Sequence, residues 1–251
     1  EMILAENLVK VYPGGVKAVD NITFDIARGE VCGYLGSNGA GKSTTIKMLC
    51  GMLQPDSGRV TIDGIDMAKD PNIAKKLIGY VPESGALFLS LTPFDFLEFT
   101  CRMYEVPKEI YTQRIGSFME MFDLKKETYT PMHAFSKGMR QKVLIIASLI
   151  HDPEVIIWDE PLSGIDYDTT ITVRNLVKEL SAAGKTFFYS THLIESVDKI
   201  CTRVIILKGG KILRELMTGE NNRGLIESIM QGGEQGNENS SENIRGLYKN
   251  S

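Results

Sequence analysis

The residues with the clearest chemical signature form a glycine-rich run between an expected strand and an expected helix. The run reads Gly36-Ser37-Asn38-Gly39-Ala40-Gly41-Lys42-Ser43, and Thr44 follows it. Backbone N–H groups of such a loop can converge on phosphate oxygens, and the N-terminus of the next helix adds partial positive charge. The Lys42 ammonium suits the outer phosphates of ATP, and the Ser43 hydroxyl suits Mg²⁺. The run, called the phosphate loop below, predicts a Mg-ATP site; the plain alternative is a glycine-rich turn.

Two adjacent acids, Asp159 and Glu160, end the apolar run 155–158. A buried strand here would place both carboxylates at its C-terminal edge, where ligands of open α/β sheets bind. We expect Asp159 to hold the Mg²⁺ shell and Glu160 to polarise the water that attacks the phosphate. Without the phosphate loop, such a pair would be equally well explained as solvated turn residues.

A third segment, residues 135–142, reads F-S-K-G-M-R-Q-K. Taken alone, it is typical of a helix capped by a serine. Beside the two motifs above, it resembles the signature motif of ABC ATPases, whose family form is L-S-G-G-Q followed by R-Q. Ser136, Gly138 and the pair 140–141 match that form. Three positions depart from it: Phe135, Lys137 and Met139.

Further elements of the family pattern follow in order over about residues 2–215. The resemblance implies that four residues contact the γ-phosphate of ATP held by a second ATPase subunit, namely Ser136, Lys137, Gly138 and Met139. It also implies that the loop at 163–166 crosses the interface between the two subunits. Two copies would then enclose two ATP molecules, as a homodimer or a heterodimer.

The resemblance assigns roles to two aromatic side chains. Tyr12 stands where the family has the aromatic residue that stacks on adenine, although a tyrosine before Pro-Gly could equally pack on the sheet. His192 follows an expected strand at the place of the family's switch histidine, which senses the γ-phosphate. A single histidine is otherwise more often a packing or surface residue.

Glu83 is a departure from the family pattern, which has a glutamine that joins Mg²⁺ to the membrane subunit's signal. A carboxylate is a stronger Mg²⁺ ligand than an amide and adds negative charge, so Glu83 remains a metal-ligand candidate with Ser43 and Asp159. The sequence around it, with Leu87-Phe88 and Leu91-Thr92-Pro93, is similar to the bacterial drug and peptide export branch.

Strands and helices are expected to alternate around these motifs. Short β-rich runs lie within residues 2–35, a helix follows from Lys42, and further strands lie at 155–158 and 186–190. This alternation predicts an α/β fold with a parallel sheet. Residues 85–135 are helical in character, with Thr92 as the N-cap of a helix and Asp95 completing a capping box.

The resemblance refines this into a P-loop NTPase core, RecA-like, with an N-terminal antiparallel β subdomain and an inserted helical subdomain. We expect one ATPase domain over 2–218, with the helical subdomain at about 85–150. Residues 219–251 are rich in Gly, Asn, Glu and Ser, and we expect a polar C-terminal tail.

Composition limits the classes of partner and the location. The 28 Lys and Arg residues against 32 Asp and Glu give a formal charge of −4, which lacks the basic excess of nucleic-acid-binding proteins. The longest apolar run, 143–150, is less than half of the ~20 residues that span a bilayer. The four cysteines are far apart in sequence and form no C-x-x-C pair, as expected of reduced thiols.

The resemblance therefore implies the ATP-hydrolysing subunit of an ABC transporter. It would act peripherally at the cytoplasmic face of the cell membrane on a separate polytopic membrane subunit, with export as the expected direction. A soluble ABC ATPase acting on nucleic acid or ribosomes is the alternative, and the single cassette and acidic charge argue against it. A regulatory subunit without hydrolysis is disfavoured by Lys42, Asp159, Glu160 and His192.

Overall fold

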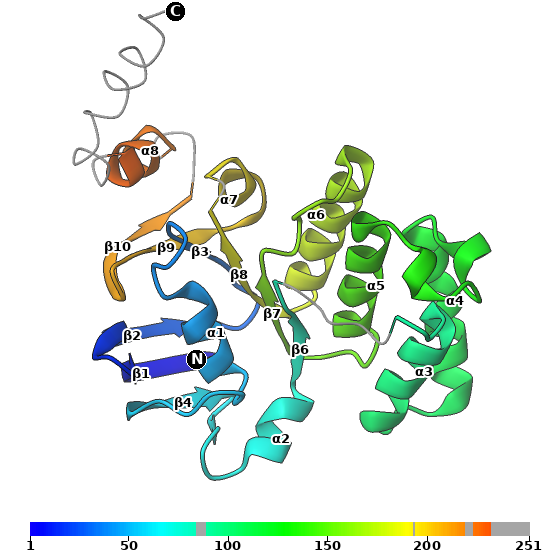
Figure 1. Cartoon of the computed structure of the whole chain (residues 1–251), viewed down its shortest axis with the longest axis horizontal. Coiled ribbons are helices and arrows are strands. Elements are labelled where there is room, and N and C mark those ends of the chain that lie inside the picture. The colour runs from blue at the N-terminus through cyan, green and yellow to red at the C-terminus, as the bar shows by residue number, and fades with distance from the viewer. Residues whose placement is uncertain (84–88, 193, 219–222, 232–251) are drawn as a thin grey trace, which may run out of the picture.

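The fold contains two β-sheets, and one helix packs between them (Figure 1). The computed structural model describes residues 1–83, 89–192, 194–218 and 223–231. The smaller sheet is antiparallel, in the order β2 (Val16–Ile26), β1 (Ile3–Tyr12), β4 (Ser57–Ile62) and β5 (Ile65–Asp66). The six-stranded sheet has the order β10 (Lys211–Met217), β9 (Arg203–Lys208), β3 (Val31–Leu35), β8 (Thr186–Thr191), β7 (Val155–Asp159) and β6 (Ile78–Val81).

The strands of the larger sheet are parallel except β10, which runs antiparallel to β9 at the edge. The parallel sheet expected from the sequence is thus confirmed for β3, β6, β7, β8 and β9. Every residue of β3, β7 and β8 is buried. A sheet covered on both faces needs apolar side chains on both, which explains the apolar runs 155–158 in β7 and 187–189 in β8.

Alternate side chains of each central strand enter two separate cores. Cys32 and Tyr34 of β3 pack with the smaller sheet and with α1 (Lys42–Leu49), which lies between the sheets. Val31 and Leu35 point to the opposite face, where helices cover the sheet. The helices that contribute to this second core include α5 (Lys137–Leu149), α6 (Tyr167–Ala182) and α7 (Ile194–Ile200).

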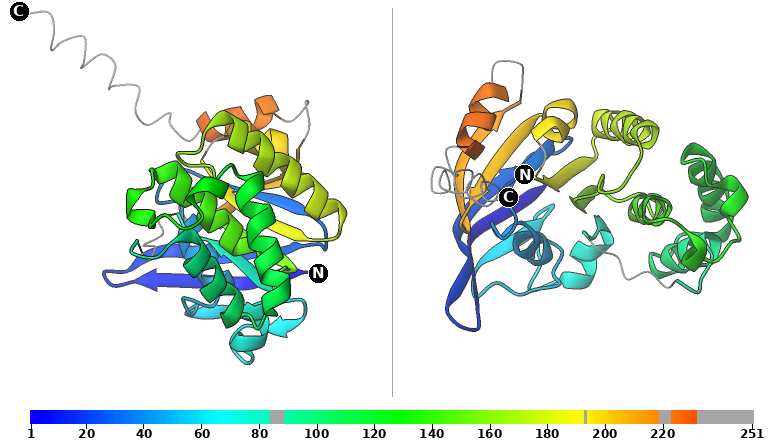
Figure 2. Two further views of the ribbon diagram at one scale, coloured as in Figure 1. Left: turned by 90° about the vertical axis from the view of Figure 1, so that its right-hand side faces the viewer. Right: turned by 45° about the horizontal axis from the view of Figure 1, so that its top comes forward.

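The helices α3 (Pro93–Met103) and α4 (Lys108–Met121) lie on the side of the molecule away from the antiparallel sheet (Figure 2). Short 3₁₀ turns at Lys125–Glu127 and Met132–Ala134 lead from them to α5, and α2 (Pro71–Lys76) precedes β6. The predicted capping box of α3 is confirmed, because Thr92 Oγ1 accepts from the Asp95 N–H and the Asp95 carboxylate accepts from the Thr92 N–H. Leu87-Phe88 lies outside the described residues.

One helix, α8 (Arg223–Gln231), lies within the segment for which a polar tail was expected. Its Ile226 is buried in the second core, and Ile229 packs against that core. These two contacts dock α8 on the ATPase domain. Residues 219–222 and 232–251 of the expected tail lie outside the described part of the chain.

The state of the cysteines and the length of the helices can be compared with what the sequence composition predicts. Cys32, Cys50, Cys101 and Cys201 are all buried and unbridged. Across the described residues, we find no helix with the length and apolar character that a bilayer crossing demands.

Strand β6 and helix α5 approach each other closely at one point. A Cβ atom on Gly79 would lie 1.8 Å from the backbone oxygen of Ser148. The Ser148 hydroxyl, in turn, accepts from the Trp158 indole N–H at 2.9 Å in the buried interior. Because backbone cannot yield as a flexible side chain can, only glycine fits at position 79.

We predict that Gly79→Ala lowers the free energy of unfolding by at least about 3 kcal/mol, since the added methyl must separate β6 from α5. The matched control is Gly116→Ala on α4, where a Cβ has nothing within 4 Å. That change should raise stability by roughly 0.5–1 kcal/mol, because alanine favours the helix. Urea unfolding measures both, and equal midpoints for the two variants would contradict the packing argument.

Candidate active site

The phosphate loop connects β3 to α1 and is held against both sheets. A Cβ on Gly41 would lie 2.2 Å from the Ala18 carbonyl oxygen of β2, and one on Gly36 would lie 2.7 Å from the Leu207 carbonyl oxygen of β9. Gly41 also has φ +108°, which side chains rarely adopt. Because these glycines have no side chains, the backbone of the phosphate loop can pass between the two sheets. The N–H groups of the loop lie beside the N-terminus of α1.

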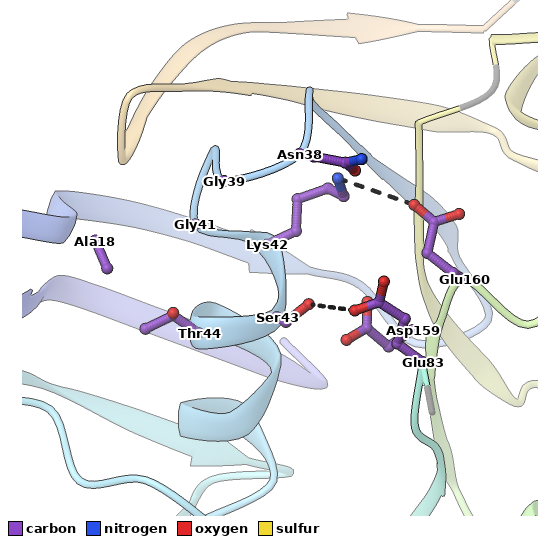
Figure 3. Close-up of a pocket in the computed structure, with 10 residues that line it drawn as sticks. All are labelled: Ala18, Asn38, Gly39, Gly41, Lys42, Ser43, Thr44, Glu83, Asp159 and Glu160. Carbon is purple, nitrogen blue, oxygen red and sulfur yellow. Dashed lines mark hydrogen bonds and ion pairs between the residues drawn. The ribbon is translucent and has the colours of Figure 1, made fainter. Parts of the chain in front are cut away.

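Most residues of the phosphate loop and the expected acidic residues meet around one cavity of about 330 Å³, the phosphate pocket (Figure 3). Gly36, Ser37 and Ala40 do not line it. The phosphate loop, β2, the end of β7 and the residues after β6 contribute its walls. The lining residues are Ala18, Asn38, Gly39, Gly41, Lys42, Ser43, Thr44, Glu83, Asp159 and Glu160. Ala40 is buried beneath the loop, where its carbonyl accepts from the Gly210 N–H.

Lys42 is a buried cation held by the loop's own carbonyl groups. Its Nζ donates to the Gly36 oxygen at 2.7 Å and to the Ser37 oxygen at 3.3 Å. The same atom lies 3.9 Å from Glu160 Oε1, and the side chain is only 7% exposed. A buried ammonium facing the pocket is suited to phosphate oxygens, because its charge is little screened by water.

The two acids at the end of β7 are positioned by Ser190 on the neighbouring strand β8. The Ser190 hydroxyl donates to Asp159 Oδ1, and the Ser190 carbonyl oxygen accepts from the Glu160 N–H at 3.2 Å. Asp159 is 2% exposed and Glu160 is 9% exposed. Glu160 has φ +50°, a left-handed conformation that side-chain-bearing residues adopt only under local constraint. No local sequence motif marks Ser190 for this role.

His192 lies against the second of these acids. Its Nδ1 is 2.8 Å from Glu160 Oε1, and its side chain is half exposed. An imidazole that donates one ring proton to a carboxylate can orient that carboxylate and present its other nitrogen to a ligand. Glu160 therefore lies between Lys42 and His192, and it lines the phosphate pocket.

The metal-ligand candidates come together on the other wall of the pocket. Ser43 Oγ donates to Glu83 Oε2 at 3.5 Å, and Asp159 lines the same pocket (Figure 3). Hydroxyl and carboxylate oxygens are the hard donors that Mg²⁺ prefers. The residues therefore fit Mg²⁺, with phosphate oxygens and water available to complete a shell of about six ligands.

Tyr12 lies at the first turn of α1, where its hydroxyl is 3.5 Å from Thr44 Oγ1. The ring is 38% exposed and lies outside the lining of the phosphate pocket. The stacking of Tyr12 on adenine remains a prediction. Ala18, which does line the pocket, had no signal in the sequence beyond its place in a strand.

The signature segment does not line this pocket. Ser136 Oγ caps α5 by accepting from the Met139 N–H at 3.2 Å. Lys137 Nζ donates to Ser163 Oγ at 3.3 Å, and a Cβ on Gly138 would lie 2.7 Å from the Gly164 oxygen. The segment therefore packs on residues 160–166, the loop that follows Glu160 in the same chain, called the acid loop below.

A second lysine of α5 contacts the C-terminal end of the acid loop. Lys142 Nζ lies 3.4 Å from Asp166 Oδ2. The Asp166 carboxylate also caps α6 by accepting from the Thr169 N–H and hydroxyl, and these hydrogen bonds lower its pKa to about 2. The middle and the C-terminal end of the acid loop are thus tied to α5.

Known proteins are similar to this chain in sequence and in fold. The family model described as ABC transporter matches residues 19–163, more than half of the chain. The ABC transporter ATP-binding protein NatA of Bacillus subtilis (strain 168) is 35% identical over 86% of this chain and 85% of its own length. The linearmycin resistance ATP-binding protein LnrL of the same organism is 37% identical, with coverages of 84% and 68%.

Among solved structures, a dimeric ATP-binding cassette in a post-hydrolysis state, bound to ADP and Pi, matches with a TM-score of 0.80 and 28% identity. The match covers 87% of this chain and 99% of that one. The expected fold, a P-loop NTPase core with an antiparallel β subdomain, is confirmed by this likeness. From the family match and its relatives together, the chain belongs to the ABC transporter ATP-binding subunits, a family of ATPases.

Proposed function

We propose that this chain binds Mg-ATP in the phosphate pocket and hydrolyses it to power export through a separate polytopic membrane subunit. It would act peripherally, at the cytoplasmic face of the cell membrane. The observation that carries the proposal is the meeting of Lys42, Ser43, Asp159 and Glu160 around one cavity. Export as the direction is supported by likeness to the Nod factor export ATP-binding protein I of Ralstonia nicotianae, which is 32% identical over 87% of this chain.

In this proposal, the phosphate loop and Thr44 hold the phosphates, and Tyr12 stacks on adenine. Ser43, Glu83 and Asp159 hold Mg²⁺, which when bound neutralises phosphate charge. Glu160 accepts a proton from the attacking water or orients it. His192 supports Glu160 through their 2.8 Å contact and senses the γ-phosphate with its other nitrogen.

We further propose that the site is completed by a second ATPase subunit. Residues 136–139 lie away from their own phosphate pocket, at the exposed N-terminus of α5. Such a helix end favours an anion, here the γ-phosphate of ATP in the other subunit. The dimeric arrangement of the matched cassette supports this assignment. An ABC ATPase acting on nucleic acid or ribosomes is not favoured by the transporter relatives.

Lys42→Ala should weaken ATP binding roughly tenfold to a hundredfold, since a buried charged hydrogen-bond donor to phosphate is lost. Isothermal titration calorimetry with Mg-ATP measures the affinity. Lys47→Ala, on the exposed face of the same helix α1, is the matched control and should bind as the wild type does. Wild-type affinity in the Lys42 variant would remove the lysine from the nucleotide site.

Glu160→Gln should retain ATP binding and lower turnover by at least about a hundredfold, because the amide keeps the shape but cannot take a proton. An ATP-stabilised dimer should then accumulate, as measured by light scattering. Glu120→Gln, at a side chain that is 69% exposed on α4, should hydrolyse ATP normally. If Glu160→Gln turned over within twofold of the wild type, the base would lie elsewhere.

Specific activity of the isolated chain should rise with protein concentration, because each site needs residues of two chains and no membrane subunit holds them together. The measurement is phosphate release across a hundredfold dilution series. Specific activity that stays constant across the series, with a monomeric ATP-bound species, would contradict the shared site while leaving ATP binding intact.

A further inference from the structure

Glu83 adds a third carboxylate to a pocket that must receive a polyanion. Glu83, Asp159 and Glu160 all line the phosphate pocket, and Lys42 is the cationic side chain among its lining residues. The three carboxylates and the one ammonium give the lining side chains a formal charge of −2. The carboxylates would therefore repel the negative phosphates of a nucleotide unless a cation bound with it.

The three carboxylates differ in how the protein compensates them. Glu160 has Lys42 at 3.9 Å and His192 at 2.8 Å. Asp159 is buried and accepts a hydrogen bond from the Ser190 hydroxyl. For Glu83, the described contact is a long one, 3.5 Å from Ser43 Oγ, and the residue is exposed. The charge of Glu83 is thus the least compensated of the three.

The partner of Glu83 is itself a candidate metal ligand. Ser43 Oγ points at the Glu83 carboxylate across the pocket (Figure 3). Asp159 lines the same pocket at the end of β7, and Trp158 before it pairs with Val81 of β6, two residues before Glu83. A cation held by Ser43 and Asp159 would meet the Glu83 oxygens as well. Two carboxylates and one hydroxyl leave about half of an octahedral shell to phosphate oxygens and water. Cation and nucleotide would therefore each complete the other's binding site.

We propose that Glu83 makes ATP binding depend on the divalent cation. With the cation bound, the Glu83 carboxylate is a ligand; without the cation, the same carboxylate repels the phosphates. Nucleotide without metal would then be rejected at the binding step. The inference rests on the proposed function, because it concerns the same Mg-ATP site.

The test compares ATP affinity by calorimetry in excess EDTA and in excess MgCl₂. Glu83→Gln should bind ATP about tenfold more tightly than the wild type in EDTA, because one negative charge near the phosphates is gone. Its affinity with Mg²⁺ should change much less, since the amide still offers an oxygen ligand. The ratio of the two dissociation constants should therefore shrink about tenfold.

Two further variants separate charge from shape. Glu83→Asp retains the charge and should retain the weak wild-type affinity for ATP in EDTA. Glu109→Gln removes an exposed carboxylate from the first turn of α4, outside the pocket, and should also retain that affinity. Since Glu83 is exposed, none of these changes removes core packing, and circular dichroism checks the fold.

Equal affinities of the wild type and Glu83→Gln in EDTA, with both binding Mg-ATP, would overturn this inference and leave the proposed function standing. An equal gain in EDTA for Glu109→Gln would also overturn it, because the effect would then be one of overall charge. Failure of the wild type to bind Mg-ATP would overturn the proposed function and, with it, this inference.

Discussion

A phosphate site made of backbone N–H groups requires a stretch of chain that passes close to its neighbours without side chains. Here that stretch lies between the two sheets. Gly41 packs closely on the Ala18 carbonyl of β2, and Gly36 packs closely on the Leu207 carbonyl of β9. Gly210 joins the same parts, because its N–H donates to the Ala40 oxygen and its oxygen accepts from the Asp20 N–H. The antiparallel sheet therefore buttresses the loop that the larger sheet presents.

The acidic half of the site depends on strand register. Asp159 pairs with Ser190 across β7 and β8, and this pairing lets one serine contact both acids. Since the central strands are apolar on both faces, polar side chains emerge where the strands end. The burial that stabilises the sheet thus also gathers the carboxylates beside the phosphate loop and limits water around them.

Local patterns were sufficient for much of this structure. The phosphate loop, the acid pair and the Thr92 cap could be predicted because each lies within a few consecutive residues. Ser190 could not, since its role arises only when two strands distant in sequence pair in register. Helix α8 carries a local signal, because Leu225, Ile226, Ile229 and Met230 recur at helical spacing, but the polar composition of residues 219–251 as a whole predicted a tail. The phosphate-facing role of Lys137 remains a prediction, and its described contact is with Ser163.

The four buried cysteines have a practical consequence for spectroscopy. Burial raises the pKa of the Cys32 and Cys50 thiols and brings that of Cys101 to about 11, so little reactive thiolate forms in these at neutral pH. Cys201 is likewise enclosed in the interior. A cysteine introduced on the surface would thus outcompete the native thiols for a maleimide dye or a nitroxide. Labelled chains of this kind could report distances between subunits without prior removal of any native cysteine.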